Sequence, residues 1–151
     1  MKKLFFSEAP HIHSGDTTQK IMLDVVIAML PATIAGIIIF GLKALWITLT
    51  CVATAVLAEF LFNLAVGKKQ TVGDLSAVVT GLLLALNLST NVKIWEAILG
   101  SVFAIVVVKC LFGGLGKNLV NPAITSRVFM LLTFGSVGAP VIINPLFSKF
   151  I

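Results

Sequence analysis

Two carboxylates lie inside long apolar stretches of this sequence, where an acidic side chain is costly and often functional. Asp24 lies in the stretch 21–40, and Glu59 lies in the stretch 44–66. Small residues share their helix faces at steps of four, namely Ala28, Ala32 and Gly36 after Asp24, and Cys51 and Ala55 before Glu59. Because small residues mark close contacts between membrane helices, we expect both carboxylates to face protein and predict them as ion-path residues. The alternative for Asp24 is a position near a helix end, paired with Lys20.

A glycine-rich loop at residues 112–118 reads Phe-Gly-Gly-Leu-Gly-Lys-Asn. It is not a Walker A loop, because Asn118 replaces the required Ser or Thr, and no strand precedes it as in a Rossmann fingerprint. Its glycines either form a tight turn or let the backbone approach a flat ligand closely. Both interpretations remain open for this loop.

The residues after this loop fit the start of a helix, with Asn121 as N-cap and Pro122 at the first position. Arg127 then falls about a turn and a half into that helix, either as a membrane-surface anchor or as the partner of an anion. We predict a cofactor-binding site whose members flank this junction, namely Gly113, Gly114, Asn118, Asn121 and Arg127.

The remaining reactive side chains predict no catalytic residue and no metal site. His11 and His13 are two positions apart without a cysteine or carboxylate pair nearby, so metal binding is not expected. Cys51 and Cys110 lie inside apolar runs and are predicted to be buried packing residues, too few to hold an iron–sulfur cluster. Hydrolytic catalysis has no support, because the sequence has no Ser-His-Asp or Cys-His arrangement.

The composition shows that membrane helices must position these residues. Hydrophobic residues make up 58% of the 151 residues and charged residues only 11%, whereas soluble domains have about 25% charged residues. Mean hydropathy is +1.09, and a soluble enzyme is excluded. The net charge of +5 comes from scattered basic residues, which argue against nucleic acid as a partner and fit loops at a membrane surface.

Three apolar runs are long enough to cross a bilayer as helices: 21–40, 44–66 and 94–111. Two further runs, 75–88 and 119–134, are short or interrupted. Such segments are typical of broken helices that line a ligand cavity, and the alternative is plain spans in a thin or tilted arrangement. We predict an all-α integral membrane protein with about five transmembrane or partly broken helices.

The basic residues predict how the chain is oriented. Residues 1–20 are expected to form a cytoplasmic N-terminal segment, and residues 21–151 a transmembrane helical domain. If all five segments cross, the N-terminal side carries more lysines: Lys2, Lys3, Lys20, Lys68, Lys69, Lys109 and Lys117 against Lys43, Lys93 and Lys149. A re-entrant segment 75–88 gives the same balance with different loops, so both arrangements remain open. Either one places the N-terminus in the cytoplasm.

Several sequence blocks together resemble a known family, that of the D subunit of the Rnf ion-translocating electron transport complex. The B subunit of the sodium-pumping NADH:quinone reductase is a more distant relative. The blocks that carry the resemblance extend from residue 9 to about residue 134, and they are residues 9–14, 21–25, 30–32, 76–88, 100–109, 112–118, 121–123 and Arg127.

The resemblance implies a multi-pass component of a redox pump in the bacterial inner membrane. The pump passes electrons between ferredoxin and NAD and couples them to sodium or proton movement, and this component is not catalytic alone. The implied partners are other Rnf-type membrane subunits, iron–sulfur and flavin subunits, and membrane lipid. The implied fold has two related halves similar to urea channels, of which this chain resembles the first. In the quinone-reductase relative, the glycines that match Gly113 and Gly114 border the quinone site.

The resemblance also implies FMN, which family members attach through its phosphate to a threonine in a Ser-Ala-Thr or Ser-Gly-Ala-Thr motif. No threonine of this chain follows such residues, and the stretch 14–17 has Asp16 in the wrong place. We therefore expect no covalent FMN on this chain. Any flavin is expected to bind non-covalently near the glycine loop and the helix start that follows it.

The chain departs from the family pattern at two points. Leu75 stands where the family usually has glycine, which is expected to alter the start of the short segment 75–88. The match fades beyond Phe134, so either the chain is a truncated product or a partner chain supplies the second half. Two other function classes remain open, a small-solute channel and a structural scaffold component of the membrane.

Overall fold

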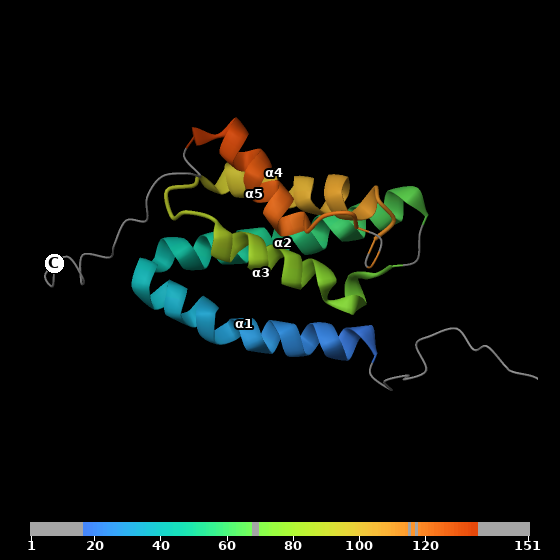
Figure 1. Cartoon of the computed structure of the whole chain (residues 1–151), viewed down its shortest axis with the longest axis horizontal. Coiled ribbons are helices and arrows are strands. Elements are labelled where there is room, and N and C mark those ends of the chain that lie inside the picture. Colours follow the sequence, from blue (N-terminus) through green and yellow to red (C-terminus); the bar gives the residue numbers. More distant parts are fainter. Residues whose placement is uncertain (1–16, 68–69, 115, 117, 136–151) are drawn as a thin grey trace, which may run out of the picture.

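The computed structural model describes residues 17–67, 70–114, 116 and 118–135, and the regular structure within these ranges is helical (Figure 1). The elements are α1 (Thr18–Phe40), α2 (Leu42–Val66), the 3₁₀ turn η1 (Val72–Asp74), α3 (Ser76–Asn87), α4 (Ile94–Val102), the π-helix η2 (Phe103–Cys110) and α5 (Pro122–Thr133). Of these, α1 and α2 are long and apolar enough to cross a membrane, and α3 and α5 are shorter apolar helices. The prediction of an all-α membrane protein is confirmed.

The long helices α1 and α2 form an antiparallel pair because the chain reverses at a glycine (Figure 1). Gly41 has a φ of +78°, which residues with a Cβ rarely adopt. Its N–H donates to the Ile37 carbonyl at 2.8 Å and closes the last turn of α1. The predicted runs 21–40 and 44–66 are therefore helices, each beginning slightly earlier than the sequence suggested.

Helix α3 runs opposite to α2 through the middle of the bundle (Figure 1). Its first residue, Ser76, lies near the C-terminal part of α2, where it shares a cavity lining with Asn63. Its last turn lies at the other end of α2, where Ala85 lines a smaller cavity together with Ala44. Segment 75–88 therefore lies along α2 and antiparallel to it. Whether it crosses the membrane or is re-entrant stays open, as in the sequence prediction.

A close contact between backbones fixes α3 against α2. A Cβ placed on Gly81 would lie 2.8 Å from the Cα of Val52 and 3.0 Å from the carbonyl oxygen of Cys51. A residue with a side chain would push the two helices apart, because real Cβ atoms do not approach backbone atoms so closely. Small residues at such contacts are typical of packed membrane helices.

Helix α4 continues without a break into η2, so the predicted run 94–111 is one helical stretch. At the end of η2 the Leu111 N–H donates at 3.1 Å to the carbonyl of Val106, five residues back. Such wide turns are rare and frequently occur at functional sites. This segment carries Lys109, which is 2% exposed.

Helix α5 begins as the sequence predicted. The Asn121 side chain accepts hydrogen bonds from the N–H groups of Ala123 (3.0 Å) and Ile124 (3.4 Å), and Pro122 occupies the first helical position. The helix is joined to α4 by the Ser126 hydroxyl, which donates to the Gly100 carbonyl at 2.6 Å.

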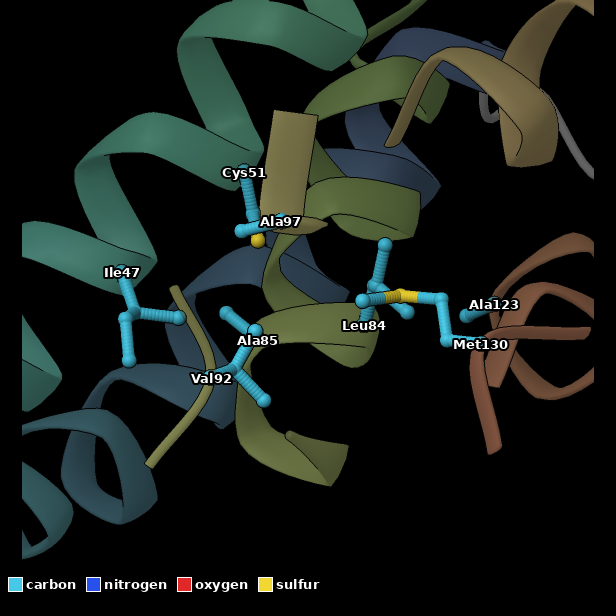
Figure 2. Close-up of a cluster of buried hydrophobic side chains, with 8 residues drawn as sticks. All are labelled: Ile47, Cys51, Leu84, Ala85, Val92, Ala97, Ala123 and Met130. Atoms are coloured by element: carbon cyan, nitrogen blue, oxygen red, sulfur yellow. The ribbon is translucent and has the colours of Figure 1, made fainter. Parts of the chain in front are cut away.

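The main core cluster joins α2, α3, α4 and α5 and is built largely from small residues (Figure 2). Its members are Ile47, Cys51, Leu84, Ala85, Val92, Ala97, Ala123 and Met130. Figure 2 shows the Met130 side chain of α5 extending toward Leu84 of α3. Cys51 is fully buried here, and Cys110 is buried in a second cluster with Ala55 and Ile105, which confirms both cysteines as packing residues.

Candidate functional site

A buried ion pair joins α2 to η2. The Lys109 ammonium lies 2.8 Å from Oε1 of Glu59, and each side chain is 2% exposed. Both charged groups are buried away from water. Their desolvation costs free energy that their mutual attraction and further hydrogen bonds must offset. The predicted burial of Glu59 on its small-residue face is confirmed, with Cys51 and Ala55 buried on the same side of α2.

Three polar side chains surround this pair and complete a hydrogen-bonded network. Lys109 also donates to the Ser76 hydroxyl at 2.7 Å. The Thr71 hydroxyl donates to Oε1 of Glu59 at 2.6 Å, and the Asn63 amide donates to Thr71 at 3.0 Å. Thr71 is exposed while Glu59 is buried, so the network leads from the surface of the described chain into the bundle.

The segment between α2 and α3 places Thr71 and Ser76 around Glu59. Leu75, the residue just before α3, has φ +58° and ψ 3°. A residue with a side chain is disfavoured in this left-handed conformation by roughly 1–2 kcal/mol. The sequence predicted that Leu75 alters the start of segment 75–88. In the structure this leucine, directly before Ser76, adopts a conformation that suits glycine.

One oxygen of the site has no partner among the described residues. Oε2 of Glu59 is buried and accepts no hydrogen bond there. An unsatisfied buried acceptor is costly, and more so when it is charged. Glu59 lines a cavity of about 360 Å³, which offers room for a partner beside this oxygen.

The glycine loop forms another wall of the same cavity. Gly113 and Gly114 line it together with Asn63, Asp74 and Cys110. The two glycines have φ values of +107° and +92°, and the Gly114 N–H donates to the Lys109 carbonyl at 3.0 Å. Their positive φ angles explain why glycine is needed here, since the chain turns tightly directly after η2.

The five predicted cofactor-binding residues are not brought together. Only Gly113 and Gly114 line the cavity. With its side-chain amide nitrogen facing the loop, Asn118 donates to the carbonyls of Lys109 (3.2 Å) and Gly114 (3.1 Å) and so stabilises the loop. Asn121 caps α5, and Arg127 is half-buried on that helix, outside the cavity lining.

The described lining does not fit the phosphate of a flavin. It contains the carboxylates of Glu59 and Asp74 and no described basic side chain, whereas phosphate is bound most strongly by cationic side chains. Lys109 is already bonded to Glu59 and Ser76. The absence of covalent FMN stays a prediction that this geometry does not test.

The predicted features around His11, His13 and residues 14–17 lie outside the described residues, as do Leu115 and Lys117.

Asp24 is placed differently from the sequence prediction. It is exposed, as are Ala28 and Ala32 on the same face of α1. Helix α1 instead packs through another stripe of residues, all of them buried or half-buried. This stripe consists of Met22, Val26, Met29, Thr33, Gly36, Ile37 and Phe40. In the described part of the chain Asp24 therefore does not face protein, because α2 and α3 pack on the other side of α1. Its role in an ion path stays a prediction.

Sequence reasoning missed Lys109 as a site residue, together with Asn63, Thr71 and Ser76. Lys109 entered the sequence prediction only as a charge outside the membrane, because it lies near the end of the run 94–111. That assignment is wrong, since the side chain is buried in the bundle. Its presence inside an apolar run is the signal that could have pointed to a buried partner.

Comparison with known proteins places the sequence in a family. The sequence matches the NQR2, RnfD, RnfE family over residues 5–139. It is 46% identical over 131 residues to the D subunit of the Na(+)-translocating ferredoxin:NAD(+) oxidoreductase complex of Acetobacterium woodii, covering 87% of this chain and 41% of that protein. It is 35% identical over 136 residues to the D subunit of the proton-translocating ferredoxin:NAD(+) oxidoreductase complex of Clostridium ljungdahlii, covering 89% and 41%.

A third similar protein is the D subunit of the ion-translocating oxidoreductase complex of Aliivibrio salmonicida. The identity is 41% over 133 residues, covering 86% of this chain and 38% of that protein. The chain thus spans about two fifths of the length of these curated relatives.

Proposed function

Because the chain belongs to the NQR2, RnfD, RnfE family, we propose that it forms part of the membrane-embedded D subunit of an ion-translocating electron-transport complex. In this proposal, the complex transfers electrons between ferredoxin and NAD, as the names of two relatives say of those proteins. The other subunits, which carry the iron–sulfur and flavin groups, are the partners of this chain. The chain itself contributes a step of the ion path.

The observation that carries the proposal is the buried Glu59–Lys109 pair with its unpartnered oxygen beside a cavity. A carboxylate in a membrane helix is costly and is typical of ion and proton paths. Among the described residues Oε2 lacks a partner, and a cation, a proton or water would meet that need. The exposed Thr71 gives the network an end at the surface of the described chain.

Lys109 determines how this carboxylate works in the path. With the ammonium 2.8 Å away, the site is electrically balanced before any ion arrives. A transported cation that approaches Oε2 therefore competes with Lys109 for the same carboxylate. We take this competition as the working step: Glu59 is bound either by Lys109 or by the cation, and Ser76 holds the displaced ammonium.

The two relatives differ in the ion that their names give, sodium in one and protons in the other. Glu59 and two hydroxyls are suited to either ion, since the carboxylate can accept a proton, and carboxylate and hydroxyl oxygens bind hard cations. The proposal is accordingly limited to a monovalent cation or a proton.

The proposed orientation places the N-terminus and the Lys68–Lys69 loop in the cytoplasm, with the chain in the inner membrane. Support comes from the lysine balance after Lys109 is removed from it, with all five segments taken to cross. Lys2, Lys3, Lys20, Lys68, Lys69 and Lys117 then lie on the N-terminal side, against Lys43, Lys93 and Lys149 on the other.

The test uses the complete complex in proteoliposomes. Glu59→Gln together with Lys109→Met removes both charges and leaves neither one unpaired. We expect ion transport to fall to the leak of the vesicles, while electron transfer between ferredoxin and NAD continues. Glu96→Gln is the matched control, because this carboxylate is also buried (4% exposed) but accepts a hydrogen bond from the Lys93 N–H at the start of α4.

Normal ion transport in the double variant would contradict the proposal. Loss of electron transfer and ion transport together, in a complex that still assembles, would return the pair to a purely structural role.

A further inference from the structure

An open groove, separate from the two cavities described above, lies at the opposite end of the bundle from Glu59. It has a volume of about 650 Å³ and lies between the start of α2 and the start of α4, and we call it the interfacial groove. Its lining includes Lys43, Trp46, Lys93, Ile94, Trp95 and Ile98. The two helices run in the same direction, so both begin at this end (Figure 1).

The charges of the groove favour an anion. Lys43 and Lys93 both line it and both are exposed, and no carboxylate is part of the described lining. Glu96 is nearby but buried, and its carboxylate accepts a hydrogen bond from the Lys93 N–H. The N-terminal ends of α2 and α4 add their partial positive charges at the same place.

The rest of the lining favours a hydrocarbon chain. Trp46 is 60% exposed, Trp95 is 49% exposed and Ile98 is 40% exposed, and all three lie further along the helices than the lysines. Tryptophan is enriched at the boundary between headgroups and acyl chains, with lysine just outside it. The groove therefore has a cationic mouth followed by an apolar floor.

We propose that the interfacial groove binds an anionic phospholipid, with the phosphate between Lys43 and Lys93 and an acyl chain along Trp46, Trp95 and Ile98. Basic pockets between membrane helices are suited to such headgroups. The proposal concerns a surface separate from Glu59 and stands without any role of Glu59 in ion transport.

The chain provides its own reporter for this site. Trp46 and Trp95 are the two tryptophans of the sequence, which has no tyrosine, so its tryptophan fluorescence comes from the groove alone. The full chain is reconstituted in phosphatidylcholine vesicles that contain a minor fraction of brominated phosphatidylglycerol or, in a parallel sample, brominated phosphatidylcholine. Bromine quenches a tryptophan only at close range, so quenching measures which lipid lies in the groove.

We expect the anionic brominated lipid to quench more strongly, with an enrichment of about fivefold for each lysine near the membrane surface. The variant Lys43→Gln with Lys93→Gln should bring the two lipids to equal quenching. Lys20→Gln is the matched control, because this exposed lysine lies near the start of α1 at the other end of the bundle. It should keep the full difference. Soluble glycerol phosphate should not remove the difference, because it lacks the acyl chain that the apolar floor binds.

Three results would each overturn the proposal. Equal quenching by both brominated lipids in the unmodified chain would show that the groove takes neutral lipid or is covered by protein. A difference that survives in the double lysine variant, or disappears in Lys20→Gln, would show general attraction to the membrane rather than a site. Competition by glycerol phosphate would show a site for soluble phosphate compounds.

Discussion

Glu59 and Asp24 have similar surroundings in the sequence, yet the fold places them in opposite environments. Both lie in long apolar helices with small residues at steps of four. Glu59 is 2% exposed and pairs with Lys109 across the bundle at 2.8 Å. Asp24 is exposed on α1. The difference comes from the elements around them, since α3 and η2 cover the Glu59 face of α2 and no described element covers the Asp24 face.

The comparison shows what a pattern of small residues means. Such a stripe allows another helix to approach closely, but it does not establish that one does. On α2 the stripe is used, and Gly81 brings α3 into backbone contact with Cys51 and Val52. A buried carboxylate then needs a charged partner from a distant segment, and Lys109 comes from 50 residues further along the chain.

The largest effect is expected when Glu59 loses its charged partner, Lys109. Lys109→Met leaves the Glu59 carboxylate buried without its counter-ion, and we expect the free energy of unfolding to fall by about 3–5 kcal/mol. The measurement is unfolding of the purified chain in mild detergent by a denaturing detergent, followed by circular dichroism.

The control for that experiment is the same change combined with Glu59→Gln. A buried ion pair replaced by neutral groups of similar volume is often neutral for stability, so the double variant should recover most of the loss. If the double variant is as unstable as Lys109→Met alone, the lysine contributes through packing of its aliphatic part, and the buried charge is not the cause.

The close approach of α3 to α2 can be tested with matched glycine changes. In Gly81→Ala the new Cβ meets the Val52 Cα at 2.8 Å, and such overpacking costs about 1–3 kcal/mol. In Gly36→Ala on α1 the Cβ meets nothing within 4 Å, and we expect a gain of up to about 1 kcal/mol from the better helix former. The same unfolding assay measures both, and equal effects would contradict the close backbone contact at Gly81.

Sequence reasoning predicted the features that depend on local pattern. The helices α1 and α2, the N-cap at Asn121 and the buried face of Glu59 are of this kind, because run length, capping chemistry and periodicity are encoded in neighbouring residues. Lys109 was counted among the loop charges at the membrane surface, because the length of an apolar run does not reveal which of its residues faces another helix. The π-helical turn adds to this, since it shifts the face that α-helical spacing predicts.

Asp24→Asn should have the smallest effect and therefore tests the other half of the comparison. The side chain is exposed in the described chain, and changes at exposed positions away from special features usually alter stability by less than about 0.5 kcal/mol. In the same unfolding assay, Asp24→Asn should lie near the unmodified chain, while Glu59→Gln alone, which leaves Lys109 buried without a carboxylate, should lose about 3 kcal/mol or more. A loss at Asp24 as large as that at Glu59 would show that the Asp24 face of α1 is covered in the folded chain after all. It would also restore the first expectation from the sequence, that both carboxylates face protein, and would make Asp24 a second candidate for the ion path.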